Sequence, residues 1–314
     1  MLILLLPPSI TTSPMVSAPL PWLDRTVLAM GTELRLHLEG AGDLGRASEG
    51  VLAESARIER ACSTWDPTSV WSRLNASEGA QVVLGAEWIN LLGRVKDWSL
   101  RTEGAFDPVL MALMQAWRIR QGGRVPAPGT LAKARMASGQ SLLVLDQREG
   151  TARLLHPQAV VEEGGFLKGY ALDAMRAVSR VSSGWLDFGG QVLAWGRPFK
   201  VDVADPRDRR RPVCSLFLEE GSLSCSGTSE RGRHLLDPRS GRPCPAWGGT
   251  AVVAPDGLSA DVLSTALYVL GPAEGLLWAE RHGVAAAFFL NDGSLRMTSR
   301  FQRLNPEMSP GVFQ

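Results

Sequence analysis

The sequence has 314 residues, of which 45% are hydrophobic and 21% are charged. This composition is typical of a folded globular protein, and the length allows one large domain or two smaller ones. Lys plus Arg number 33 and Asp plus Glu number 32, so the formal net charge of +1 gives no reason to expect a nucleic acid or an acidic membrane as partner.

The chain opens with a short apolar run, Met1 to Leu6, that is far too short to span a bilayer. The run lacks the basic residues of a secretory signal, and no cysteine follows it that could carry a lipid anchor. We therefore expect no transmembrane segment, and both export and a cytoplasmic location stay open. We divide the chain into a flexible leader or targeting segment, a folded part and a C-terminal tail, at residues 1–22, 23–305 and 306–314.

Hydrophobic periodicity predicts strands and helices in the first half of the chain. They are a strand over Thr26–Leu38 with Met30-Gly31-Thr32 inside it, amphipathic helices over Leu44–Cys62 and Trp88–Trp98, and a hairpin from residues 142–145 and 152–155. Gly104 lies where the second helix should be capped at its C-terminal end.

In the second half, a helix is predicted over Phe166–Val181, with Gly184 closing it. Another helix is predicted to begin at Ser259, as its N-cap, and to end near Leu270. Gly271 and Pro272 separate the latter from another short helix. Strands are predicted at Trp185–Leu193, Phe199–Val203, Val213–Leu218 and Val284–Leu290. Strands and helices alternate irregularly, with hairpins, which favours an α+β fold over a doubly wound parallel sheet.

Several common catalytic and binding motifs are missing from the sequence. It contains no G-x-x-x-x-G-K-[ST] phosphate loop, no G-x-G-x-x-G after a strand, no H-E-x-x-H and no G-x-S-x-G. The four cysteines form no C-x-x-C pair and the four histidines are scattered, which makes a zinc site improbable. Any metal ligands are therefore expected to be oxygens, which points to magnesium or calcium.

Residues 259–265 are the most informative segment. Asp261 and Thr265 are four residues apart, so on a helix they share one face and can hold one hard cation between a carboxylate and a hydroxyl. Magnesium takes one or two carboxylates and completes its shell with substrate phosphates. An acidic residue early in a helix is also common capping chemistry, and that interpretation stays open.

Two further segments carry chemistry that a phosphate ligand would need. Residues 162–170 join two acids, paired glycines and Lys168 at a predicted strand-to-helix junction, where the glycines allow a ligand close to the backbone. A glycine-rich turn is the plainer interpretation. His234 lies just before the Asp237-Pro238 turn and is either a general base or a hydrogen-bonding residue that stabilises the turn.

Taken in order, these segments resemble the ApbE family of FAD:protein FMN transferases. The matching motifs are M-G-T at 30–32, S-T-W-D-P-T-S-V-W-S-R-L-N at 63–75, G-A-F-D-P at 104–108, E-E-G-G-F-L-K-G-Y-A-L-D at 162–173, G-G-x-x-x-x-x-G at 189–196, H-L-L-D-P-R-S-G-R-P at 234–243 and A-D-V-L-S-T-A at 260–266. Each motif alone is loose, but seven in register are a specific signature covering most of the chain.

The resemblance implies two intimately joined α+β lobes with largely antiparallel sheets flanked by helices, related to the T-fold, and FAD between them. It implies an FAD site lined by Met30, Trp65, Ala105, Phe106, Asp107, Glu162 and Lys168. It implies Mg²⁺ held by Asp261, Thr265 and the Gly165 carbonyl, with Ser264 as a further candidate ligand. His234 would accept the proton of the attacking hydroxyl or position the phosphate.

The activity that the resemblance implies is transfer of FMN from FAD to a Thr or Ser hydroxyl of an acceptor protein, with release of AMP. Two departures are visible: Glu162 stands where the family usually has Asp, and the segment between Gly227 and His234 is short. The alternatives are an FAD pyrophosphatase that uses water as acceptor, and a flavin-binding protein without turnover.

Overall fold

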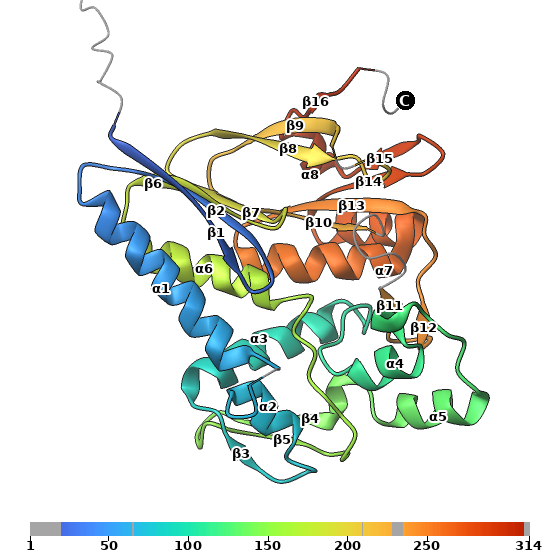
Figure 1. Cartoon of the computed structure of the whole chain (residues 1–314). Helices are drawn as coiled ribbons and strands as arrows, with labels where there is room; N and C mark the ends of the chain where they lie inside the picture. The colour runs from blue at the N-terminus through green and yellow to red at the C-terminus, as the bar shows by residue number, and fades with distance from the viewer. Residues whose placement is uncertain (1–19, 65, 209, 228–234, 311–314) are drawn as a thin grey trace, which may run out of the picture.

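The centre of the molecule is an eight-stranded antiparallel sheet with strand order β1-β2-β6-β7-β10-β13-β14-β15 (Figure 1). The computed structural model describes residues 20–64, 66–208, 210–227 and 235–310. The strands of this sheet are β1 Trp22–Ala29, β2 Thr32–Glu39, β6 Ser183–Phe188, β7 Val192–Trp195, β10 Gly221–Gly227, β13 Gly248–Ala254, β14 Ala285–Leu290 and β15 Leu295–Met297. An antiparallel sheet that is covered by helices confirms the predicted α+β class.

Both faces of the sheet are covered, and β14 shows how. Ala286 and Phe288 belong to the large core beneath the sheet, whereas Ala287 and Phe289 belong to a smaller core above it. This alternation explains the continuous apolar run of the strand. The first face is covered by the helices α1 Leu44–Cys62, α6 Leu167–Ser179 and α7 Gly257–Arg281. The second face is covered by α8 Ser299–Gln302 and by a three-stranded sheet, whose strands are β16 Glu307–Met308, β9 Pro212–Leu218 and β8 Phe199–Ala204.

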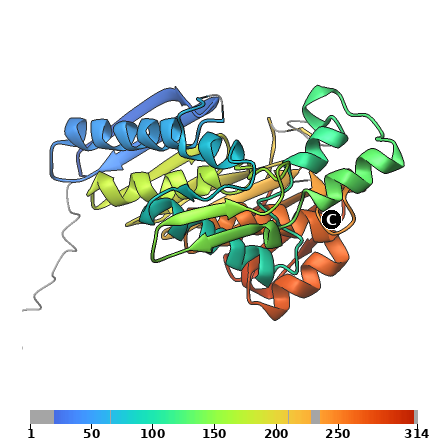
Figure 2. The same cartoon turned by 90° about the horizontal axis from the view of Figure 1, so that it is seen from below.

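A second lobe lies below these helices and carries two small groups of elements. One group is α2 Val70–Asn75, α3 Ala86–Arg101, η2 Gln140–Leu142 and the sheet of β3 Val82–Val83, β5 Thr151–Leu154 and β4 Leu143–Asp146. The other group is α4 Met111–Ala116, η1 Ile119–Gln121, α5 Pro128–Met136, β11 Leu236–Asp237 and β12 Arg242–Pro243. Figures 1 and 2 place α4 and α5 at the end of the molecule opposite α1.

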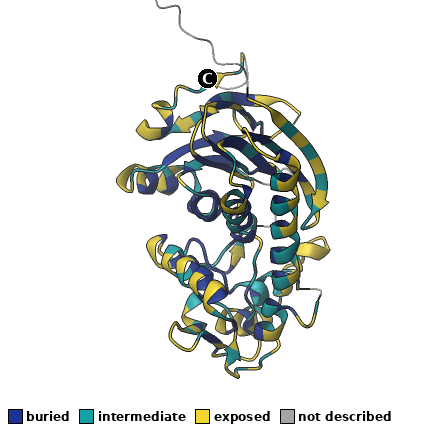
Figure 3. Cartoon of the chain, turned by 90° about the vertical axis from the view of Figure 1, so that its left-hand side faces the viewer, coloured by how far each residue is buried: buried dark blue, intermediate teal, exposed yellow. Residues whose placement is uncertain are grey.

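Burial is concentrated where the helices meet the sheet, and the periphery is exposed (Figure 3). Among the described residues, α7 alone has the length and apolarity that could suit a bilayer, yet 56% of its most apolar window is buried inside the fold. Gly271, with φ of 78°, also interrupts the helix before Pro272, as predicted. The apolar residues of α7 are therefore core residues of this fold.

The predicted single strand over Thr26–Leu38 is wrong. Met30 and Gly31 have φ of 48° and 73° and form the turn of a hairpin between β1 and β2. Two consecutive left-handed residues match the twist of a two-residue hairpin, so the M-G-T motif ends one strand and starts another. The predicted strand over Trp185–Leu193 is likewise a hairpin, because the chain turns between β6 and β7.

Two predicted helix ends are also corrected. Asp256, rather than Ser259, caps α7, since its side chain accepts a hydrogen bond from the Ser259 backbone nitrogen at 2.8 Å. Arg180, with φ of 53°, ends α6, while Gly184 lies inside β6, where a Cβ would overlap the His37 carbonyl oxygen. By contrast, the predicted bounds of α1 are confirmed, and the predicted hairpin over 142–145 and 152–155 is present as β4 and β5, with each strand displaced by one residue.

Candidate active site

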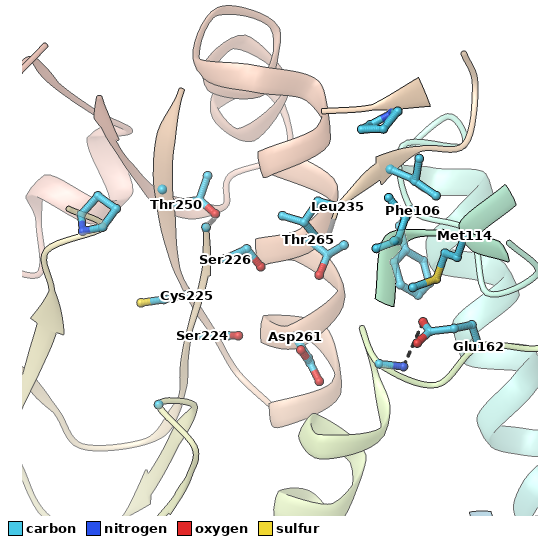
Figure 4. A pocket seen from close by; sticks show the side chains of 18 of the residues that line it. Phe106, Met114, Glu162, Ser224, Cys225, Ser226, Leu235, Thr250, Asp261 and Thr265 are labelled. Carbon is cyan, nitrogen blue, oxygen red and sulfur yellow. Dashed lines mark hydrogen bonds between the residues drawn. The ribbon is translucent and has the colours of Figure 1, made fainter. Parts of the chain in front are cut away.

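A cavity of about 1090 Å³ lies between the two lobes. Figure 4 shows its arrangement: Ser224, Ser226 and Thr250 lie on one side, Asp261 and Thr265 in the middle, and Phe106, Met114 and Glu162 on the other side. We call the side formed by β10, β13 and α7 the core wall, with residues Ser224, Ser226, Thr250, Asp261 and Thr265. We call the opposite side, from α4 through the following turn, the outer wall, with residues Met114, Trp117, Ile119, Arg120 and Arg124.

The core wall is positioned by a close crossing of α6 and α7. A Cβ on Gly169 would overlap the carbonyl oxygen of Gly257, so only glycine allows the two backbones to approach this closely. Asp173 on α6 accepts hydrogen bonds from the backbone nitrogens of Gly257 and Leu258 at 2.6 and 3.0 Å. The Gly169 nitrogen donates to Asp261 Oδ2 at 3.0 Å, so α6 fixes both the start of α7 and its carboxylate.

Asp261 is a buried carboxylate with an unusual electrostatic environment. Burial raises its pKa, whereas the positive charge of Lys168 and the Gly169 N–H lower it. Removing a carboxylate from water is costly unless a positive charge or hydrogen-bond donors stabilise it. This position therefore favours a ligand that brings a cation to Asp261.

The oxygens around Asp261 fit a hard cation. Thr265 lies one helical turn further along, and a Cβ on Gly165 would come within 3.4 Å of Thr265 Oγ1, so the glycine-rich loop passes directly beside this hydroxyl. A carboxylate, a hydroxyl and a nearby carbonyl are ligands that Mg²⁺ accepts, with phosphates and water completing the shell. In the described part of the chain, no cluster of three or more His, Cys, Asp or Glu side chains could hold a metal ion instead.

Ser264, the further candidate ligand, is placed differently. It is fully buried, and its hydroxyl is hydrogen-bonded to the Asp261 carbonyl oxygen at 3.0 Å and to the hydroxyls of Ser224 and Ser226 at 3.1 and 2.9 Å. The Thr250 hydroxyl donates to the Ser264 carbonyl oxygen at 3.0 Å. This network ties α7 to β10 and β13, which makes the core wall rigid.

Ala105, Phe106 and Asp107, the predicted FAD-site residues of the G-A-F-D-P motif, line the cavity, and all three are buried. Both carboxylate oxygens of Asp107 accept backbone hydrogen bonds, from Val109 at 2.8 Å and from Gln140 at 2.7 Å. Burial nevertheless raises the pKa of Asp107 to about 6, because desolvation outweighs these donors. Asp107 thus shapes the loop that presents Phe106 to the cavity.

Glu162 and Lys168 also line the cavity. The Glu162 carboxylate accepts hydrogen bonds from Arg120 Nη2 at 2.8 Å and from the Gly164 nitrogen at 3.1 Å. Arg120 was not predicted as a site residue, and no local pattern could have found it, because it lies 42 residues from Glu162 in the sequence. The pair links the outer wall to the glycine-rich loop.

Among the predicted FAD-site residues that the structure describes, Met30 is the one that does not line this cavity. Met30 lies in the β1–β2 turn, packs on the large core and is not among the residues that line the cavity. Trp65 and His234 lie outside the described residues. The residues that follow His234 do line the cavity, since Leu235 and Leu236 belong to its wall.

The turn that follows His234 is held by Trp117 of the outer wall and by Arg135 of α5. Trp117 Nε1 donates to the Gly241 carbonyl oxygen at 2.8 Å, and the Arg135 guanidinium donates to the carbonyl oxygens of Arg239 and Ser240, both at 3.1 Å. Three donors on one short turn fix its path relative to α4 and α5. The outer wall therefore touches both loops that border this side of the cavity.

Gln191 is a cavity residue that the sequence did not indicate. It is 2% exposed, and its Nε2 donates to the Gly257 carbonyl oxygen at 2.8 Å. Its Oε1 has no hydrogen-bond partner among the described residues. Buried polar atoms are rarely left unsatisfied, so Oε1 is an acceptor available to a hydroxyl or N–H of a ligand.

Comparison with known proteins settles the family. The profile of the ApbE family matches residues 30–289. The chain belongs to the ApbE family. Two curated relatives are both named FAD:protein FMN transferase: one from Rhodobacter capsulatus is 28% identical over 307 residues, and one from Treponema pallidum is 27% identical over 313 residues.

The alignments cover 90% and 88% of this chain, but 58% of the Rhodobacter protein and 86% of the Treponema protein. Among solved ApbE structures, the apo form of the flavinyl transferase ApbE from Pseudomonas stutzeri superposes with a TM-score of 0.83 at 27% identity, covering 92% of this chain and 98% of that one. The ApbE protein from Thermotoga maritima has the same TM-score at 24% identity, over 90% and 99% of the two chains. The ApbE-like fold is thereby confirmed.

Proposed function

We propose that this chain transfers FMN from FAD to a Thr or Ser hydroxyl of an acceptor protein and releases AMP, in a reaction that depends on Mg²⁺. The observation that carries the proposal is the position of Asp261 and Thr265 in the middle of the cavity, with Ser226 on one side and Phe106 on the other. A dinucleotide has its diphosphate between two bulky halves, so this layout matches FAD. The names of the relatives support the same activity.

The reaction breaks the bond between the FMN phosphorus and the bridging oxygen of the diphosphate, and forms a bond between that phosphorus and the acceptor oxygen. The hydroxyl proton must leave the acceptor, and AMP leaves with the bridging oxygen. Because phosphoryl transfer is promoted mainly by positioning and charge neutralisation, the protein groups needed are oxygen ligands, cations and one base. The cavity supplies the first two in its described part.

Asp261, Thr265 and the Gly165 carbonyl would hold the cation, and Lys168 would place a positive charge beside the same phosphates. Bound there, Mg²⁺ would supply neutralisation of the charge that develops on the diphosphate oxygens. Phe106, buried at the wall, offers a ring face for an aromatic half of FAD, and Trp65 is proposed for the same task. His234 is the proposed base, and the turn that follows it borders the cavity.

The test is mass spectrometry of an acceptor protein after incubation with the chain, FAD and Mg²⁺. The proposal predicts a covalent gain of one FMN unit on a Thr or Ser of the acceptor, with one AMP released for each adduct. AMP without an adduct would instead identify an FAD pyrophosphatase. FAD that is bound but intact would identify a flavin-binding protein without turnover.

A further inference from the structure

The outer wall belongs to a segment with an unusual charge distribution. Residues 108–145 contain five cationic residues and no Asp or Glu, although the whole chain has a net charge of only +1. The rest of the chain is therefore net negative. The five cations are Arg118, Arg120, Arg124, Lys133 and Arg135.

Some of these cations are engaged inside the protein and others are not. Arg120 pairs with Glu162, and Arg135 binds the turn at residues 239–240. Arg118 and Arg124 are exposed and form no ion pair with any residue in the described ranges. Beside them, Val125 is 77% exposed. We call Arg118, Arg120, Arg124 and Val125 the basic rim.

Three members of the basic rim, Arg120, Arg124 and Val125, line the cavity, and Arg118 belongs to the same turn without lining it. The residues that line the cavity at its floor are buried, as Phe106, Thr250 and Asp261 are. By contrast, the lining residues Arg120, Arg124 and Val125 are exposed to solvent. A macromolecule that brings a hydroxyl to Asp261 past the outer wall comes close to these side chains, whereas Asp202 and Cys225 are the exposed lining residues on the side of β8 and β10.

A turn with restricted backbone geometry presents these side chains. Arg118 has φ of 49°, and Gly122 and Gly123 have φ of 87° and 79°. The Arg124 nitrogen donates to the Trp117 carbonyl oxygen at 2.8 Å and closes the turn at its base. Since Trp117 is itself bound to Gly241, the turn has a fixed position at the edge of the cavity.

We propose that the basic rim is the docking surface for the acceptor protein, and that it recognises an acidic surface around the residue to be modified. The inference rests on the proposed function and adds the chemistry of the partner. Arg118 and Arg124, which form no ion pair within the described ranges, lie beside the exposed Val125, and arginine next to an exposed apolar side chain is typical of a protein interface. Complementary charge would raise the rate of encounter and orient the acceptor hydroxyl toward the floor of the cavity.

The experiment compares two synthetic acceptor peptides that carry the same threonine in a flexible Gly/Ala segment. One peptide is flanked by three aspartates and the other by three lysines. With the full chain, FAD and Mg²⁺, we expect a KM for the acidic peptide about tenfold below that for the basic peptide, and an advantage that shrinks as salt is raised.

The variant Arg118→Asp replaces one positive charge of the rim by a negative charge. Aspartate also tolerates the left-handed backbone conformation of this position. We expect the variant to raise the KM for the acidic peptide several-fold, to lower the KM for the basic peptide, and to leave the KM for FAD unchanged. Arg148→Asp is the matched control, because Arg148 is exposed on the turn between β4 and β5 and is not part of the rim. It should change neither peptide KM.

Several results would overturn the inference. One such result is an equal KM of the wild-type chain for the two peptides. Another is an Arg118→Asp variant in which the KM for FAD changes while the KM for each peptide stays the same. Binding of phosphatidylserine vesicles by the wild-type chain but not by Arg118→Asp would assign the rim to a membrane instead. A wild-type chain that releases AMP without labelling either peptide or any acceptor protein would refute the proposed function itself, which is a separate outcome.

Discussion

The two walls of the cavity are built in different ways. The core wall belongs to the large core, and its polar groups are hydrogen-bonded to one another through Ser264. The outer wall belongs to a small cluster of Leu113, Ala134 and Leu236 and carries exposed arginines. Groups that must hold reacting atoms need a rigid support, whereas groups that meet a partner tolerate a smaller and more exposed one. The contrast is consistent with the two proposals made above, chemistry at the core wall and recognition at the outer wall.

The largest effect is expected at the centre of the core wall. Asp261→Ala removes the carboxylate of the proposed cation site, and a bound cation contributes several kcal/mol to the transition state, so kcat should fall by at least about 10³-fold. Asp202→Ala is the matched control, because Asp202 is an exposed carboxylate in the same cavity. AMP release is the measurement. Activity in Asp261→Ala above about a tenth of wild type would place the cation elsewhere.

The support beneath the core wall should be intolerant of added volume. Gly169→Ala places a methyl group into the Gly257 carbonyl oxygen, and overpacking of this kind costs about 3 kcal/mol or more. Gly50→Ala is the control within α1, since nothing lies within 4 Å of the added Cβ and alanine favours a helix by about 1 kcal/mol. Denaturant unfolding should show the first variant destabilised and the second stabilised. Equal stabilities would mean that the helix crossing is looser than described.

A pH effect of intermediate size is expected from Asp107. Its pKa in the folded protein is raised from 3.8 to about 6, so the folded state binds an additional proton over this interval. Stability should therefore fall as pH rises from about 4 to about 6, by roughly 2–3 kcal/mol, and then stay lower. Asp107→Asn cannot ionise and should lose this part of the pH dependence. Thermal unfolding of both proteins at several pH values measures it, and parallel curves would contradict the assignment.

The smallest effect is expected at the contact between the outer wall and the glycine-rich loop. The Arg120 side chain is 56% exposed, so its pairing with Glu162 contributes about 0.5–1 kcal/mol after solvent screening. A double-mutant cycle with Arg120→Ala and Glu162→Ala, measured through FAD binding, should give a coupling energy of this size. A coupling of several kcal/mol would make this contact as rigid as the core wall and remove the contrast between them.

Local patterns predicted the parts of the molecule that depend on local physics. Leu44, Val51 and Ile58 recur on one face of α1, and the predicted bounds of that helix match the structure. The spacing of Asp261 and Thr265 is likewise local, and both residues line the cavity. The M-G-T motif was misread as strand interior because Met30 adopts a left-handed conformation that its residue type does not signal.

Contacts between distant segments could not be predicted. Nothing near Gly169 in the sequence indicates that it meets Gly257, and nothing near Glu162 indicates Arg120. Ser264 was a plausible ligand from its neighbours alone, but tertiary packing turns its hydroxyl toward β10. Such pairings depend on how the two lobes fold together, which a single sequence does not encode in any local pattern.

The most direct test of the account is the location of the metal. Mn²⁺ accepts the same oxygen ligands as Mg²⁺ and scatters X-rays anomalously, so crystals grown with FAD and Mn²⁺ would reveal it. If Asp261 and Thr265 hold the cation, one strong anomalous peak will lie between the Asp261 carboxylate and the Thr265 hydroxyl, next to the diphosphate of FAD. A peak elsewhere in the cavity, with Asp261 in contact only with protein atoms, would contradict it.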